Sequence, residues 1–183
     1  MSETYEKARQ LYKPDHIKYL LIAESPPPSA EIQSSRQFYY TDRIRRDDRL
    51  FTNTIRALYP EAVDAPEAEL EERKTDWLKR FKDDGWYMIE ALEKSQRHEV
   101  TKKQRQEHIR EAVPRLIERL HDLNIEPDTK IILIKSNVFE VATQPLRDAD
   151  FTVLNHELVD YPGQFNQRAY REKLAGLVGV RSK

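Results

Sequence analysis

Four short apolar runs recur along the chain, separated by longer polar stretches. They cover residues 17–23 (IKYLLIA), 86–92 (WYMIEAL), 130–134 (KIILI) and 151–154 (FTVL). Each run is rich in β-branched, aromatic or leucine residues, a composition typical of buried strands. Because apolar residues follow one another within a run instead of alternating with polar ones, we expect strands that are covered on both faces, as in parallel sheets.

The stretches between these runs carry helical patterns. Residues 50–58 and 66–84 separate the first two runs, and the second stretch opens at Pro66 and closes before Gly85, which suits the two ends of a helix. Before the third run, apolar residues recur at helical spacing: Ile109, Val113, Leu116, Ile117, Leu120 and Leu123. Pro114 lies inside that stripe and predicts a kink or a helix that begins there.

Two further helices are predicted at residues 136–147, with Ser136 as the N-cap, and at residues 164–178. Strands that alternate with helices predict an α/β fold, here a three-layer α/β/α domain around a central four-stranded parallel sheet. Because the sequence shows no linker, internal repeat or low-complexity tract, residues 1–183 are predicted to form a single domain.

Composition excludes several kinds of chemistry. The chain has 183 residues, a formal net charge of -1 and no cysteine. The missing cysteines exclude disulfides, thiolate zinc sites, iron–sulfur clusters and a cysteine nucleophile. No apolar run approaches the roughly 18–20 residues that cross a membrane, and the N-terminus lacks a signal-peptide pattern. We therefore expect a cytoplasmic protein without membrane attachment.

Charge is distributed unevenly along the chain. All charged residues within 61–72 are acidic, whereas residues 36–49, 94–110 and 168–183 lean basic. A basic face opposite an acidic one can bind a polyanion, although each run is equally compatible with an ordinary solvated surface.

The loops that follow the predicted strands are where an open parallel sheet binds its ligands. Three of them stand out, at residues 24–47, 93–101 and 156–167. The first places Glu24 and Ser25 at the carboxyl end of a strand, where a carboxylate can orient water or stabilise a developing cation. Further along, Phe38, Tyr39 and Tyr40 form either a flat stacking surface for a base or a group of rings that caps the core.

This loop resembles that of the uracil-DNA glycosylase superfamily, in particular the branch whose first motif reads Gly-Glu-Ala-Pro-Gly. The motif is matched in order by Ala23, Glu24, Ser25, Pro26 and Pro27, with proline in place of the last glycine. The resemblance implies that Glu24 positions the hydrolytic water and that Ser25 and Pro26 line the substrate pocket. It also implies that Phe38 or Tyr39 stacks on a flipped base.

Two later segments support the resemblance. Residues 112–116 (AVPRL), ahead of the third apolar run, are similar to the family's Cys-Pro-x-Leu helix. Tyr161, Pro162, Gly163 and Gln164, followed by a predicted helix, resemble its His-Pro-Ser loop, which implies substrate contacts for this corner. The resemblance spans nearly the whole chain, with the motifs in the same order, and implies a uracil-DNA glycosylase-like fold.

The chain departs from the family at the histidine that stabilises negative charge on the departing base. Tyr161 stands at that position, and a neutral phenol can donate one hydrogen bond in its place. His156 could substitute if the loop slides, or it is an ordinary residue at a strand end. The iron–sulfur cysteines of the Gly-Glu-Ala-Pro-Gly branch are also missing.

Glu90 stands where the same branch carries the asparagine that reads uracil. An amide both donates and accepts, whereas an ionised carboxylate only accepts. Glu90 therefore favours a base with adjacent donors, such as guanine or protonated cytosine, and predicts a target other than uracil. The alternative is that Glu90 forms a structural ion pair with an arginine or lysine.

The last loop supplies predicted DNA contacts. Asn166 and Arg168 gather with Gln164 at a helix N-terminus, where free amides and the helix dipole favour a phosphate. Phe165 is either an apolar wedge that fills the vacated base stack or a buried residue of an amphipathic helix.

Together these features predict a monomeric DNA glycosylase-like hydrolase that acts on a flipped, non-uracil base in single- or double-stranded DNA. Glu24 and Tyr161 would be its catalytic residues, without a metal or cofactor, and Arg45 and Arg46 would contact phosphates at the pocket entrance. One alternative is a catalytically inactive nucleic-acid or nucleotide-binding protein of the same fold. Another is a structural protein whose acidic residues 61–72 bind a basic partner.

Overall fold

The computed structural model describes residues 3–27, 38–41, 48–96, 99–123 and 125–180. Within them the chain forms an α/β fold around three parallel strands, in the order β2-β1-β3. The strands are β1 (Tyr19–Ala23), β2 (Trp86–Glu90) and β3 (Lys130–Leu133). They coincide with the first three apolar runs, so the predicted α/β class and the parallel sheet are confirmed.

The fourth predicted strand does not form and leaves only a bridge beside β3. Val153 pairs with Ile131 there, in parallel. The side chain of Asn155 explains why the ladder stops: its Oδ1 accepts from the backbone N–H of Leu133 at 3.0 Å, and its Nδ2 donates to the Leu133 carbonyl at 3.2 Å. Because a side chain satisfies both backbone groups, a fourth strand is not needed to pair them.

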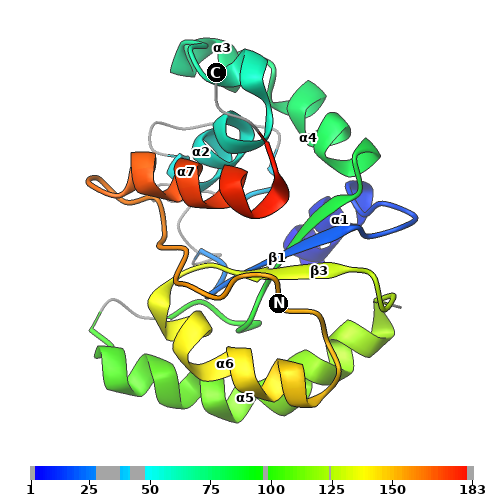
Figure 1. The fold of residues 1–183 in the computed structure, drawn as a ribbon, viewed down its shortest axis with the longest axis vertical. Coiled ribbons are helices and arrows are strands. Elements are labelled where there is room, and N and C mark those ends of the chain that lie inside the picture. The colour runs from blue at the N-terminus through cyan, green and yellow to red at the C-terminus, as the bar shows by residue number, and fades with distance from the viewer. Residues whose placement is uncertain (1–2, 28–37, 42–47, 97–98, 124, 181–183) are drawn as a thin grey trace.

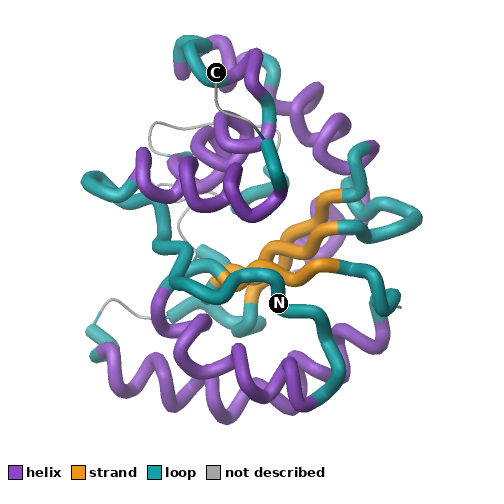
Figure 2. The backbone as a smooth tube through the Cα atoms, in the orientation of Figure 1, coloured by secondary structure: helices purple, strands orange, loops and turns teal. Residues whose placement is uncertain are grey.

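Seven α-helices surround the sheet within the described residues. They are α1 (Glu3–Leu11), α2 (Arg49–Leu58), α3 (Glu67–Glu72), α4 (Lys74–Asp83), α5 (Lys102–Asp122), α6 (Ser136–Asp148) and α7 (Gln167–Val178), with the 3-10 helix η1 (Pro60–Ala62) after α2. Figure 1 shows α5 and α6 on one side of the sheet and α2 and α7 on the other. Figure 2 shows the strands enclosed between these helices, which is why all five residues of β2 are buried.

Two helix predictions are corrected by the structure. The single helix expected over residues 66–84 is two helices, α3 and α4, separated at Arg73. Of the two alternatives for Pro114, a helix that begins there is wrong, because α5 begins at Lys102 after a reciprocal capping box of Thr101 and Gln104 and runs through the proline. The buried stripe of α5 continues on both sides of the proline, so packing keeps the helix intact across the lost backbone donor.

Helix α1 was not predicted, because no apolar run marks it. None of the helices in the described ranges is long and apolar enough to span a membrane.

Candidate functional site

A buried carboxylate lies at the carboxyl end of the central strand. Glu24 follows β1 directly and is only 5% exposed. Its Oε1 accepts hydrogen bonds from Nζ of Lys135 at 2.9 Å and from Nη1 of Arg105 at 3.1 Å. Its Oε2 accepts one from Nδ2 of Asn137 at 2.7 Å. The start of α5, the end of β3 and the first turn of α6 thus converge on one carboxylate, and we call these four residues the Glu24 cluster.

The turn from β3 into α6 brings two members of the cluster to Glu24. Lys135 has a φ of 79°, in the left-handed region that residues other than glycine rarely adopt, and it is the N-cap of α6 in place of the predicted Ser136. Such a conformation costs about 1–3 kcal/mol and persists where the surroundings enforce it. Here the backbone N–H of Lys135 donates to the Val159 carbonyl at 2.8 Å, which fixes the turn.

The surroundings of Glu24 keep it ionised. Burial alone would raise the pKa of its carboxyl, but hydrogen bonds from Lys135, Asn137 and Arg105 outweigh burial and hold the pKa below its ordinary value. At neutral pH Glu24 is therefore a carboxylate that accepts hydrogen bonds and attracts positive charge.

Asn137 adds a second acceptor beside that carboxylate. The residue is 4% exposed, and within the described part of the chain its Oδ1 is buried without a hydrogen-bond donor. A carboxylate offers about four acceptor positions, of which Glu24 uses three. The hydrogen bond between Asn137 and Glu24 therefore joins two residues that can each accept a further hydrogen bond, at Oε2 of Glu24 and at Oδ1 of Asn137. A donor such as a water molecule would satisfy Oδ1 of Asn137.

The loop with the predicted Tyr161 corner reaches the same edge of the sheet. Val159, bonded to Lys135, lies beside the end of β3, and Tyr161 follows two residues later with 39% of its side chain exposed. The backbone N–H of Gly163 donates to the Tyr161 carbonyl at 2.7 Å, and Pro162 between them is buried. The structure therefore brings this corner and Glu24 to one edge of the sheet.

The turn before α7 projects a large aromatic ring. Phe165 is 90% exposed, and Gln164 and Asn166 beside it are also exposed. Helix α7 begins only after this turn, so the alternative of a buried helical Phe165 is wrong. Arg168 is 85% exposed and pairs with Glu172 at 2.7 Å.

The aromatic residues after the first loop belong to the core. Phe38 and Tyr39 are 2% and 4% exposed. The ring of Phe38 stacks on Tyr5 of α1, with centroids 4.4 Å apart, and Tyr39 packs edge-on against Phe51 of α2 at 5.6 Å. The two rings cap the core instead of forming the predicted open stacking surface, because burying them removes large apolar areas from water.

Glu90 forms the structural ion pair that was the alternative to base recognition. Its carboxylate pairs with Arg9 of α1, and the two side chains are 7% and 4% exposed. Arg119 donates to the Glu90 carbonyl at 2.9 Å. Burial raises the pKa of the Glu90 carboxyl, while the charges of the two arginines act in the opposite direction. The carboxylate is thus directed at α1 and not at a base edge.

The other predicted site residues lie next to Glu24, on the surface or outside the described residues. Pro26 is buried and Ser25 half-buried, directly after Glu24. His156 is exposed, with its Nδ1 3.5 Å from Arg147 Nη2. Arg45 and Arg46 lie outside the described residues.

Sequence reasoning missed the partners of Glu24. Lys135 and Asn137 come directly after the third apolar run, so the rule that selected the other strand ends could have found them. Arg105 lies just past the 93–101 loop and carries no sequence signal of its own, because its contact with Glu24 spans 81 positions.

Three described side chains, His16, Glu126 and Asp128, have the spacing of a metal site. However, Nδ1 of His16 faces Glu126 at 3.3 Å, whereas its Nε2 faces Asp128 at 3.8 Å. The carboxylates thus approach opposite sides of one ring, an arrangement that favours two contacts to the imidazole over a shared ion.

Comparison of the chain with protein-family models, with curated proteins and with solved structures finds no match. The relationship to uracil-DNA glycosylases stays a prediction.

Proposed function

We propose that the protein binds nucleic acid at the carboxyl edge of its sheet and hydrolyses the N-glycosidic bond of a flipped nucleotide. The observation that carries this proposal is the pair of acceptors formed by Oε2 of Glu24 and Oδ1 of Asn137. A water that donates one hydrogen to each acceptor presents its lone pairs away from them. This is the orientation that a nucleophilic water needs.

Hydrolysis at this site would proceed through a cation-like sugar. The glycosidic C–N bond breaks with its electron pair on the departing base, the water oxygen bonds to the sugar carbon, and one water proton leaves for the base or solvent. The ionised Glu24 stabilises the positive charge on the sugar, as carboxylates do at oxocarbenium-like transition states. Arg105 and Lys135 keep Glu24 ionised, and the Tyr161 hydroxyl at the same edge is the proposed donor to the base.

The exposed Phe165 supports the nucleic-acid part of the proposal. A ring that is 90% exposed contributes nothing to the core, whereas base-flipping proteins insert apolar side chains into the stack that the base leaves. The amide-rich turn around it, with Gln164 and Asn166, precedes the N-terminus of α7, which favours a phosphate beside the wedge.

A second candidate is a nucleic-acid or nucleotide-binding protein without hydrolytic activity. The burial of Phe38 and Tyr39 and the ion pair of Glu90 favour it, because the side chains expected to stack on and read the base are engaged in the core.

The two candidates are distinguished by measuring DNA binding and base release on the same substrates. Single- and double-stranded oligonucleotides that carry uracil, hypoxanthine or modified guanine and cytosine would be incubated with the protein and then cleaved with alkali at abasic sites. Hydrolysis predicts strand breaks that Glu24→Gln reduces by a factor of about 100 or more while binding persists. Glu93→Gln, which removes a half-exposed carboxylate after β2, is the matched control and should leave cleavage unchanged.

Tight binding with no abasic product on any substrate would overturn the hydrolase proposal and support the second candidate. Robust release of uracil alone would contradict the prediction of a non-uracil target.

A further inference from the structure

A cavity of about 310 Å³ opens between α2, η1 and α7, on the helical layer above the sheet. Its apolar lining comes from α2, from η1 and the residue after it, and from α7 and the segment after it: Ala57, Pro60, Val63, Ala175 and Val180. None of the four residues of the Glu24 cluster lines it. The volume lies at the lower end of the range of small-molecule sites.

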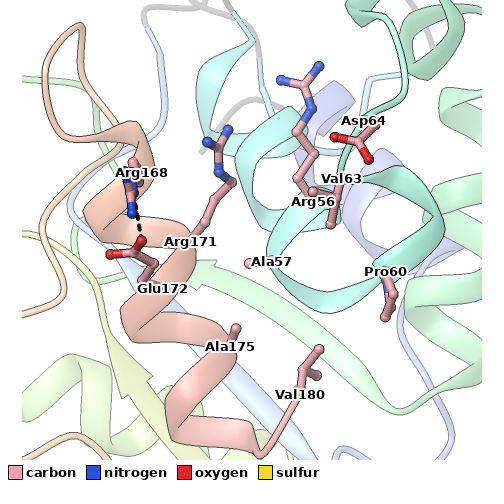
Figure 3. Close-up of a pocket in the computed structure, with 10 residues that line it drawn as sticks. All are labelled: Arg56, Ala57, Pro60, Val63, Asp64, Arg168, Arg171, Glu172, Ala175 and Val180. Atoms are coloured by element: carbon pink, nitrogen blue, oxygen red, sulfur yellow. Dashed lines mark hydrogen bonds and ion pairs between the residues drawn. The ribbon is translucent and has the colours of Figure 1, made fainter. Parts of the chain in front are cut away.

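The charged side chains around the cavity do not all neutralise one another. Arg168 pairs with Glu172 at 2.7 Å, whereas Arg56 and Arg171 have no ion pair with any carboxylate among the described residues. Asp64 also lines the cavity, and within the described residues it forms no ion pair with Arg56 or Arg171. Figure 3 shows the side chains of Arg56 and Arg171 extending in the same direction from α2 and α7. Arg56 and Arg171 are therefore two like charges on the cavity wall, and neither forms an ion pair within the described residues, although Asp64 and Glu172 also line the cavity.

Both arginines are held by neutral acceptors. Nη1 of Arg171 donates to Oδ1 of Asn53 at 3.1 Å, and Asn53 is fully buried at the junction of α2 and α7. Nη2 of Arg56 donates to the Ala65 carbonyl at 2.9 Å, and its Nε is buried without an acceptor among the described residues. Such contacts fix the positions of the guanidinium groups and leave most of their donors unused, since each group has five.

The junction that holds these arginines is rigidly built. The hydroxyl groups of Thr54 and Tyr170 are hydrogen-bonded at 2.7 Å in the buried interface of α2 and α7. Burial and the positive charge of Arg56 lower the pKa of Arg171, and the nearby carboxylate of Glu172 offsets this only in part.

We infer that this cavity binds a small phosphate monoester, with the phosphoryl group between Arg56 and Arg171 and the organic part against the apolar lining. The planar guanidinium fork matches phosphate oxygens, and two forks from facing helices can share one group. An anion here would also relieve the repulsion between the two arginines. This site is separate from the one proposed for base release, and its assignment does not depend on that function.

Calorimetric titration of the full chain with inorganic phosphate and with a nucleoside 5′-monophosphate tests the inference. We expect the nucleotide to bind at least tenfold more tightly than inorganic phosphate, because only the nucleotide uses the apolar lining. Arg56→Gln and Arg171→Gln should each weaken nucleotide binding at least tenfold. Arg110→Gln, on the exposed face of α5, is the control and should have no effect.

Thermal unfolding of each variant shows whether it is folded. If Arg171→Gln does not fold, the nucleotide affinity of Arg56→Gln tests the inference on its own. Absence of nucleotide binding, or an equal loss of affinity in Arg110→Gln, would overturn the inference. So would binding of a single-stranded oligonucleotide that depends on both arginines while the monophosphate does not bind, since that result would assign the cavity to a nucleic-acid backbone.

Discussion

Asn137 donates a hydrogen bond of 2.7 Å to Glu24, a residue 113 positions earlier in the chain. The bond joins the first turn of α6 to the end of β1, and Oδ1 of the same amide is a buried acceptor that receives no hydrogen bond within the described residues. This hydrogen bond thus connects α6 to the end of the central strand. It also forms the pair of acceptors on which the proposed hydrolysis depends.

The first prediction concerns the pH dependence of stability. Because the folded-state pKa of Glu24 lies below its ordinary value of 4.5, its stabilising contribution is complete above that value and is lost as the pH falls through the folded-state pKa. Glu24→Gln should lower the free energy of unfolding by about 2 kcal/mol at pH 7. The difference between wild type and variant in urea unfolding should shrink at pH 3.5. A difference that stays constant or grows in acid would contradict the described environment of Glu24.

The second prediction concerns the buried ion pair that attaches α1 to the sheet. Glu90→Gln removes the buried carboxylate that faces Arg9 and leaves this arginine with the half-exposed Glu6 as an ion-pair partner. The substitution should cost about 3 kcal/mol in the free energy of unfolding. Replacing both side chains, as in Arg9→Met with Glu90→Leu, should recover most of that loss, because apolar residues need no counter-charge. Chemical denaturation of the three proteins measures this.

The exposed pair of Glu107 and Arg110 provides the control for the ion pair. Glu107→Gln should change stability by less than about 0.5 kcal/mol. If Glu90→Gln were equally mild, or if the double variant were less stable than the single one, α1 would not be attached in the way described.

These contacts show what the sequence could and could not predict. The strands were predictable because β1, β2 and β3 are contiguous apolar runs, and Glu24 was predictable as a polar residue at a strand end. The missing fourth strand was not, because it depends on the side chain of Asn155 satisfying Leu133 across 22 positions. Helix α1 was not predicted either, since its attachment depends on contacts with distant parts of the chain, such as the pair between Arg9 and Glu90, 81 positions apart.

The same limit applies to the candidate site. An aromatic residue in a loop has the same sequence signature whether it points to solvent or into the core. Phe38 lies in the core because Tyr5 of α1 stacks on it, and the sequence pattern did not predict α1. Phe165 lies outside because α7 begins only after it.

The third prediction separates DNA binding from folding at Phe165. Because the ring is 90% exposed, Phe165→Ser should change stability by less than about 0.5 kcal/mol. As a wedge it should weaken binding to lesion-containing duplex DNA about tenfold or more, measured by fluorescence anisotropy. Leu11→Ser, at an apolar side chain of α1 that is 66% exposed, is the control. Unchanged DNA affinity in Phe165→Ser would exclude the wedge.

The fourth prediction concerns the hydrogen bond between Thr54 and Tyr170 at 2.7 Å. Tyr170→Phe keeps the ring and removes the hydroxyl, so the free energy of unfolding should fall by about 1 kcal/mol. Nucleotide binding in the nearby cavity should weaken in parallel if this junction positions Arg171, and calorimetry on the folded variant measures that. A loss of stability without any change in affinity would show that the junction is not needed to position the arginine.

Single-turnover base release by Asn137→Ala tests the central claim most directly. The substitution removes Oδ1, which has no donor among the described residues, together with the hydrogen bond to Oε2 of Glu24, and it leaves Glu24 paired with Lys135 and Arg105. Gln144→Ala, at an exposed amide on the same helix, is the matched control. If Glu24 and Asn137 together hold the attacking water, Asn137→Ala should slow base release about 100-fold at saturating protein with DNA affinity unchanged, whereas Gln144→Ala keeps the wild-type rate. Base release at the wild-type rate in Asn137→Ala, or none in the wild type itself, would contradict the account.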